Sequence, residues 1–179
     1  MKDIQTAQKL FWIDLEMTGL DIQKEVVIEV AALVTDFDFA VLDEWETVVR
    51  QPQSFLAAMD DWNKKHHGES GLTTKVPQGM PPQEVEQHLI AMLEKNFVGA
   101  KEKPILCGNS IGQDRLFLAK YFQNFEARLH YRMLDVSSWK VIFNNKYNLK
   151  YQKKNSHRAL DDIRESIEEL KFYLSYMKM

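Results

Sequence analysis

The chain has 179 residues, a formal net charge of −3 and 45% hydrophobic residues, which is the composition of a globular protein. Its single cysteine, Cys107, excludes an intrachain disulfide and favours a reducing compartment. No apolar run approaches the roughly 18 residues of a membrane span, and the first residues lack a signal-peptide pattern. We therefore expect one domain over residues 1–179 of a soluble cytoplasmic protein. Its charge balance does not favour binding to long duplexes.

The first third of the chain predicts an antiparallel meander of three strands. Residues 10–16 alternate between apolar and polar side chains, which is typical of a strand. Valine-rich segments at 25–35 and 40–50 predict the next two strands, and the sequence DFDF between them predicts a turn. Residues 51–81 hold much of the proline, glycine and polar punctuation, so we expect short helices and loops there.

After residue 81 the pattern alternates between helix and strand. Stripes of apolar residues at helical spacing predict helices near 82–97, 114–122, 137–144 and 159–175. Short apolar runs predict strands at 104–107 and 131–136. Strands followed by alternating helices and strands predict an α/β fold in which helices flank a mixed sheet.

Two segments place acidic residues where a site could form. Asp14 and Glu16 are two residues apart on the first predicted strand, so both side chains leave the same face. Such a face is either a site or open to water. Asp162 lies on the face of the last predicted helix that carries small residues, whereas Asp161 points to solvent. The ordinary alternative for Asp162 is a first-turn acid that interacts favourably with the helix dipole.

Asp114 and His157 complete a possible constellation. Asp114 follows GNSIGQ at a predicted junction of loop and helix, and His157 precedes Asp162 in an H-x4-D pattern. A histidine can take a proton from water near neutral pH, although one in a lysine-rich segment is often a plain surface residue. Four carboxylates in one place repel each other unless cations neutralise them. The combination predicts two divalent metal ions, and carboxylate ligands favour Mg²⁺ or Mn²⁺.

Other hydrolytic chemistries find little support in the sequence. It contains no G-x-S-x-G motif, and Cys107 lies in an apolar segment, so a serine or cysteine nucleophile is disfavoured. It also contains neither C-x-x-C nor H-E-x-x-H, which disfavours zinc.

A basic segment precedes the last predicted helix. Residues 140–158 contain no acid, and they form either a solvated loop or a basic lip that attracts a short anionic substrate. The cations of this segment are Lys140, Lys146, Lys150, Lys153, Lys154 and Arg158.

The three acidic motifs, in this order, resemble the DEDD-type exonucleases of the histidine subclass. WIDLEMTGL, MDDWN, CGNSIGQDR, HYRMLDVSS and DDIRES further resemble the oligoribonuclease family over nearly the whole chain. The resemblance implies a ribonuclease-H-like fold with a five-stranded mixed sheet flanked by helices. It also implies a metal-dependent 3′-to-5′ exoribonuclease that hydrolyses very short single-stranded RNA, especially dinucleotides, to nucleoside 5′-monophosphates.

The resemblance also implies a role for each matching residue. The metal ligands would be Asp14, Glu16, Asp114 and Asp162, and the general base would be His157. The substrate-binding residues would be Leu20 as a wedge between two bases, Trp62 and His67 beside the bases, Gln113, and Ser110, Arg132 and Ser137 around a 5′ phosphate. His66 is an alternative to His67. Tyr131 would enter the site of a partner subunit, so the resemblance implies a homodimer.

Two alternative functions remain compatible with the residues. One is another exonuclease of the same superfamily, such as a DNA-trimming or proofreading enzyme. The other is a binding module that keeps the fold without activity, although all five catalytic positions carry suitable chemistry.

Overall fold

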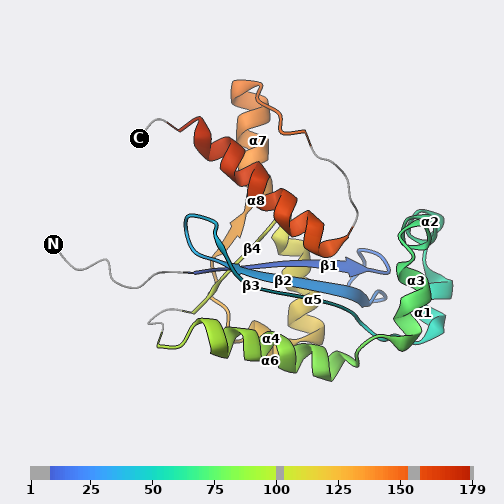
Figure 1. Ribbon diagram of the computed structural model, residues 1–179. Coiled ribbons are helices and arrows are strands. Elements are labelled where there is room, and N and C mark those ends of the chain that lie inside the picture. The colour runs from blue at the N-terminus through green and yellow to red at the C-terminus, as the bar shows by residue number, and fades with distance from the viewer. Residues whose placement is uncertain (1–8, 100–102, 153–157, 178–179) are drawn as a thin grey trace.

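A computed structural model describes residues 9–99, 103–152 and 158–177 (Figure 1). Five strands form one sheet in the order β3-β2-β1-β4-β5. The first three strands pair antiparallel, and β4 and β5 add in parallel to β1. The sequence therefore predicted the mixed sheet correctly. The strands are β1 (Leu10–Met17), β2 (Val27–Thr35), β3 (Val41–Val48), β4 (Ile105–Gly108) and β5 (Met133–Asp135).

Helices cover both faces of this sheet (Figure 1). One face carries α7 and α8, the other carries α4, α5 and α6, and the short helices α1 to α3 lie beyond the end of β1. The helices are α1 (Gln53–Ala58), α2 (Asp61–Glu69), α3 (Leu72–Lys75), the 3₁₀ helix η1 (Val76–Gln78), α4 (Pro82–Asn96), α5 (Ile111–Tyr121), α6 (Gln123–Glu126), α7 (Val136–Tyr147) and α8 (Ala159–Ser175).

The alternation of β1 divides the core into two layers. Phe11, Ile13 and Leu15 pack with the α4–α5–α6 layer, where both phenylalanines Phe11 and Phe125 are fully buried. Trp12 packs on the opposite face with α8, and its indole N–H donates to the Thr35 hydroxyl over 3.0 Å. Because successive side chains of a strand point to opposite faces, the acidic positions of β1 lie on the α8 side.

Several boundaries differ from those that the sequence predicts. The helix expected at 137–144 runs to Tyr147, where Asn148 ends it in a left-handed conformation with φ 52°. The helix that contains Asp114 begins at Ile111, before its expected start. The short helices within 51–81 agree with the expectation for that segment. Among the described residues, no helix is both long and apolar enough to cross a membrane.

Candidate active site

Three acidic side chains from distant parts of the sequence meet above the sheet. Asp14 and Glu16 come from β1 and Asp162 from the first turn of α8, and each offers a carboxylate oxygen within 4.8 Å of the others. All three residues are half-buried. We call Asp14, Glu16 and Asp162 the carboxylate cluster. Asp161, the neighbour that the sequence assigns to solvent, is exposed and contacts Arg164 instead.

Ionisation of the cluster is unfavourable in the absence of a cation. The pKa of Glu16 is raised to about 8, first by burial and then by the nearby carboxylates of Asp162, Glu29 and Asp114. The Arg158 guanidinium opposes this rise. A divalent cation would neutralise several of these charges at once. Hard oxygen donors in a half-buried place suit Mg²⁺ or Mn²⁺, so the residues present fit such an ion.

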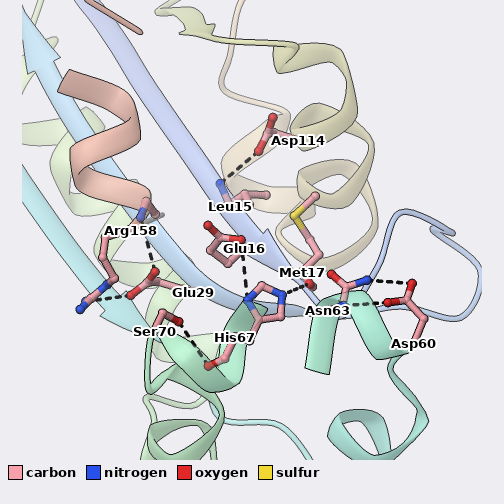
Figure 2. Close-up of polar contacts among 11 residues, drawn as sticks. Leu15, Glu16, Met17, Glu29, Asp60, Asn63, His67, Ser70, Asp114 and Arg158 are labelled. Atoms are coloured by element: carbon pink, nitrogen blue, oxygen red, sulfur yellow. Dashed lines mark hydrogen bonds and ion pairs between the residues drawn. The ribbon is translucent and has the colours of Figure 1, made fainter. Parts of the chain in front are cut away.

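Asp114 comes from the first turn of α5 and contacts β1 at Leu15 (Figure 2), and it is not one of the three acids of the cluster. The pairing of β1 with β4 runs from Leu10↔Ile105 to Trp12↔Cys107, and farther along β1 the Leu15 N–H donates to the Asp114 carboxylate over 3.0 Å. Burial raises the pKa of Asp114, and the hydrogen bond from Leu15 opposes this rise. The Asp114 carboxylate therefore accepts from a β1 backbone N–H beyond the residues that pair with β4. The same carboxylate also raises the pKa of Glu16.

The last residue of β4, Gly108, approaches β1 closely because it has no side chain. A Cβ atom on Gly108 would lie 2.9 Å from the carbonyl oxygen of Ile13 and 2.8 Å from the Ile111 side chain. These contacts are shorter than a side chain tolerates, so glycine permits the turn from β4 into α5. That turn brings Asp114 against β1.

His67 supports the backbone at the end of β1 and lies beside Glu16 (Figure 2). It is buried, and its Nε2 lies 2.9 Å from the Met17 carbonyl oxygen. A carbonyl can only accept, so Nε2 carries the proton and Nδ1 faces a Glu16 oxygen 4.0 Å away. Burial lowers the pKa of His67, which disfavours the charged form of the ring.

The sequence left His66 and His67 as alternatives for a place beside the bases, and the structure separates their settings. His66 stacks on Trp62 with ring centroids 4.6 Å apart, while His67 lies inside against β1. Trp62 is 68% exposed, so it presents an aromatic surface to solvent.

Leu20 is exposed at the tip of the loop that follows β1, although it is a large apolar residue. Its side chain is 72% exposed, and its carbonyl oxygen accepts a 2.9 Å hydrogen bond from the Gln113 side chain. Gln113 is the residue before Asp114, so α5 holds both the middle of β1 and the loop beyond it.

Short polar groups meet where β4 and β5 end. The Ser110 N–H lies 2.7 Å from the Ser137 Oγ and 3.0 Å from Asp135 Oδ1, and the two serine hydroxyls are 2.8 Å apart. The Ser137 hydroxyl also donates to the Asn109 side chain over 2.6 Å. Ser110 adopts a left-handed conformation with φ 55°. The structure thus brings together Ser110 and Ser137, two of the three residues expected around a phosphate.

Tyr131 and Arg132 lie on the surface just before β5. Tyr131 is 71% exposed, and the Arg132 guanidinium lies 4.8 Å from the centre of its ring. Arg115 donates to the carbonyl oxygens of His130 and Tyr131, over 2.9 and 3.1 Å, and pairs with Glu126. These contacts hold the backbone of the segment while leaving the tyrosine ring accessible.

The expected general base, His157, lies outside the described residues, as do Lys153 and Lys154 of the basic segment. The last residue of that segment, Arg158, forms an ion pair with Glu29 of β2, with 3.0 Å between Nη2 and Oε1 (Figure 2). Glu29 was not predicted as a site residue. Its signal was an acid inside the apolar run VVIEVAALV, in a strand that is buried over its full length.

Comparisons with known proteins agree with the resemblance seen in the sequence. The sequence model of the Exonuclease family matches residues 11–170. An oligoribonuclease of Francisella tularensis subsp. tularensis (strain WY96-3418) is 48% identical over 174 residues, which cover 95% of this chain and 96% of the relative. The mitochondrial oligoribonuclease of Bos taurus is 46% identical over 176 residues, covering 93% of this chain and 72% of the relative.

Solved structures share the fold at low sequence identity. The nuclease domain of 3′hExo, a DEDDh family member bound to rAMP, matches with a TM-score of 0.66 and 16% identity, covering 96% of this chain and 94% of that domain. A zinc-bound exonuclease I–ssDNA complex from E. coli matches with a TM-score of 0.72 and 14% identity over 95% of this chain. This chain spans 41% of that longer one.

Proposed function

The chain belongs to the exonuclease family and, within it, to the oligoribonucleases, and on this premise we propose how its site acts on RNA. It is a nuclease that hydrolyses phosphodiester bonds as a 3′-to-5′ exoribonuclease. We propose that its preferred substrates are very short RNAs, above all dinucleotides, and that its products are nucleoside 5′-monophosphates.

The observation that carries the proposal is the carboxylate cluster. Asp14, Glu16 and Asp162 place oxygens within 4.8 Å of one another, and burial together with mutual repulsion raises the pKa of Glu16 to about 8. Carboxylates that repel one another when ionised are suited to bind cations, because a cation neutralises their charges. In the proposed site, these three residues and Asp114 would hold two divalent ions, Mg²⁺ or Mn²⁺.

When bound, two such ions supply charge neutralisation for the phosphodiester and for the oxygen that leaves it. His157 takes the proton from the attacking water, because a neutral imidazole is a suitable base near neutral pH. His67 fixes the end of β1 through its hydrogen bond to the Met17 carbonyl oxygen. Asp114 fixes the β1 backbone between Asp14 and Glu16 through the Leu15 N–H.

Short substrates are selected, in this proposal, by contacts at both ends. Leu20 inserts between two bases, and Trp62, supported by His66, offers a stacking surface. Base stacking on an aromatic side chain contributes roughly 1–3 kcal/mol with little sequence preference. The serines Ser110 and Ser137, together with Arg132, bind the 5′ phosphate. Longer chains then lack room beyond this phosphate.

We further propose that the active protein is a homodimer in the cytoplasm. Tyr131 supports the first part, because its exposed ring has Arg132 beside it and a backbone fixed by Arg115. A ring placed in this way can reach a second copy of the chain.

The test is hydrolysis of 5′-phosphorylated RNAs from two to about ten nucleotides long, in Mg²⁺, Mn²⁺ or EDTA, with every intermediate resolved. We expect metal-dependent release of monophosphates from the 3′ end and the fastest turnover on the dinucleotide. Equal or better cleavage of long RNA or DNA would retain the metal site and reject the length selection. Absence of cleavage with either metal would favour the binding module.

A further inference from the structure

Glu29 is a buried acid near the start of β2, and it contacts the beginning of α8. It is 1% exposed and lies directly opposite Glu16 in the antiparallel pairing of β1 and β2. One oxygen accepts from the Arg158 guanidinium over 3.0 Å, and the other lies 3.5 Å from the Ala159 N–H. A charge is placed in such an interior only when it is paired and hydrogen-bonded.

The two groups that Glu29 contacts define where α8 starts. Arg158 is the residue before the helix, and Ala159 is the first helical residue, whose N–H has no acceptor within the helix itself. Within the described residues, the side chain of Arg158 does not cap its own helix, so the Glu29 carboxylate acts there from the neighbouring strand. The Arg158 carbonyl then accepts from the Asp162 N–H over 2.9 Å. One helical turn therefore connects Glu29 to the carboxylate cluster.

We propose that Glu29 and Arg158 are a positioning pair, which fixes the start of α8 on β2 so that Asp162 stands against Asp14 and Glu16. The inference rests on the proposed function of the carboxylate cluster, because positioning matters to catalysis only if the cluster holds the metal ions. Neither residue touches the substrate or the metals in this role, which is exerted through the placement of Asp162. The charges of Glu29 and Arg158 also act on Glu16 directly and with opposite signs, so the position of the helix start is measured separately from metal affinity.

The other contacts of α8 do not provide the same control. Ile163, Ile167 and Leu170 bury the helix on the sheet, but apolar packing is non-directional and tolerates small shifts of a helix. Hydrogen bonds to a charged group are short and directional. Repulsion between Asp162 and the acids of β1 also pushes the start of the helix away from the sheet. The Glu29–Arg158 pair opposes that displacement at the residue where it would begin.

The pair is tested with Glu29→Gln, which keeps the shape and removes the charge, and with Arg158→Gln and Arg158→Lys. We expect Glu29→Gln and Arg158→Gln to lower both kcat and Mn²⁺ affinity about 10–100-fold, as changes behind metal ligands do. KM for a dinucleotide should stay near the wild-type value, because the substrate contacts are intact. Arg158→Lys keeps the charge and should restore most of the loss.

Mn²⁺ affinity is measured by calorimetry on metal-free protein, and the first turn of α8 is followed by amide hydrogen exchange. Faster exchange at Ala159 and Asp162 in Glu29→Gln reports a loosened helix start without any reference to activity. Arg164 provides a matched control, because it joins the same helix to β3 farther along the chain. Its Nη2 lies 2.9 Å from Glu44 Oε2. Arg164→Gln should leave kcat and Mn²⁺ affinity unchanged.

A second control separates positioning from general stability. Ile167→Val removes one buried methylene from α8 and should destabilise the fold without moving Asp162. If Ile167→Val lowers Mn²⁺ affinity as much as Glu29→Gln does, the positioning role is wrong. It is also wrong if Glu29→Gln keeps wild-type exchange at Ala159 and Asp162, whatever its Mn²⁺ affinity, because Glu29 then acts on Glu16 by its charge alone. Failure of the wild-type protein to hydrolyse RNA would instead reject the proposed function, and the exchange and Mn²⁺ measurements would still decide the positioning.

Discussion

Asp162, a proposed metal ligand, contributes a repulsive charge to the fold. Its carboxylate is close to those of Asp14 and Glu16 and helps to raise the pKa of Glu16. In the metal-free protein this repulsion opposes folding, whereas in the proposed metal-bound protein the same groups would be ligands. Stability and activity therefore respond in opposite directions to the loss of this carboxylate.

Asp162→Asn should raise the melting temperature of the metal-free protein, because it removes a repulsive charge while keeping the shape. It should also lower turnover of a dinucleotide by more than about 100-fold, the upper end of what changes behind a ligand cost. Calorimetry without metal and rate measurements with Mn²⁺ check the two effects.

Asp161→Asn is the matched control, since Asp161 is exposed and contacts Arg164 rather than the cluster. It should leave both quantities near their wild-type values. A metal-free Asp162→Asn protein that melts below the wild type would contradict the repulsion described here.

Sequence reasoning reached some of these residues and missed others for physical reasons. Two acids in a D-x-E pattern on a strand must share a face, so Asp14 and Glu16 could be placed together in advance. The difference between His66 and His67 depends on the docking of α2 against β1, which no local pattern encodes. Glu29 was not predicted because the apolar residues around it are typical of an ordinary buried strand.

At the scale of elements, the carboxyl ends of β4 and β5 form a second polar region. Ser110, Ser137, Asn109 and Asp135 bond to one another there, and the N-terminal turns of α5 and α7 start beside them. Parallel neighbouring strands deliver both ends to the same edge of the sheet. Ligands commonly bind at such edges in open α/β sheets.

Arg132→Ala should weaken turnover of a 5′-phosphorylated dinucleotide roughly 10–150-fold in kcat/KM, the equivalent of one charge-assisted hydrogen bond of about 1.5–3 kcal/mol. An otherwise identical dinucleotide without the phosphate should be affected far less, because the lost partner is absent. Parallel kinetics on the two substrates measure the difference.

Arg128→Ala is a suitable comparison, since Arg128 pairs with Glu94 on an exposed part of the surface. Arg128→Ala should change kcat/KM for the two dinucleotides by the same factor. Equal losses on both substrates in Arg132→Ala would argue against a phosphate contact.

The elements themselves were largely predictable where the pattern is regular. Alternation and valine content indicated β1 to β3, and the long stripes of α4 and α8 indicated their helices. The exact starts of α5 and α7 were not predictable, because Asp135 caps α7 through the Ser137 N–H and Ser110 enters α5 in a left-handed conformation. Such ends depend on contacts between the two loops rather than on periodicity.

At the scale of the whole molecule, the metal-free protein should lose stability as the pH rises. The folded state holds the Glu16 proton up to a pKa of about 8, whereas the unfolded chain releases it near 4.5. Between these values the folded state binds more protons than the unfolded state, so the free energy of unfolding falls with increasing pH. The loss of folding free energy that arises from ionising Glu16 is absent below about pH 4.5 and complete above about pH 8.

Denaturant unfolding of the metal-free protein at several pH values across this window measures the trend. Asp114 contributes in the same direction, because burial raises its pKa as well. Glu16→Gln should flatten the decline, and saturating Mg²⁺ should reduce it in the wild type. A metal-free protein whose stability rises through this window would contradict the raised pKa of Glu16.

The wide separation of the acids along the chain has a consequence for synthesis. Asp14 and Glu16 leave the ribosome early, and β1 can pair locally with β2 long before α8 exists. Local pairings form quickly, whereas contacts between distant segments close large loops and form later. The sheet can therefore assemble while only two of the three clustered acids are present. The nascent protein meets the full electrostatic penalty of its site only when α8 docks, after most of the apolar core is available to offset it.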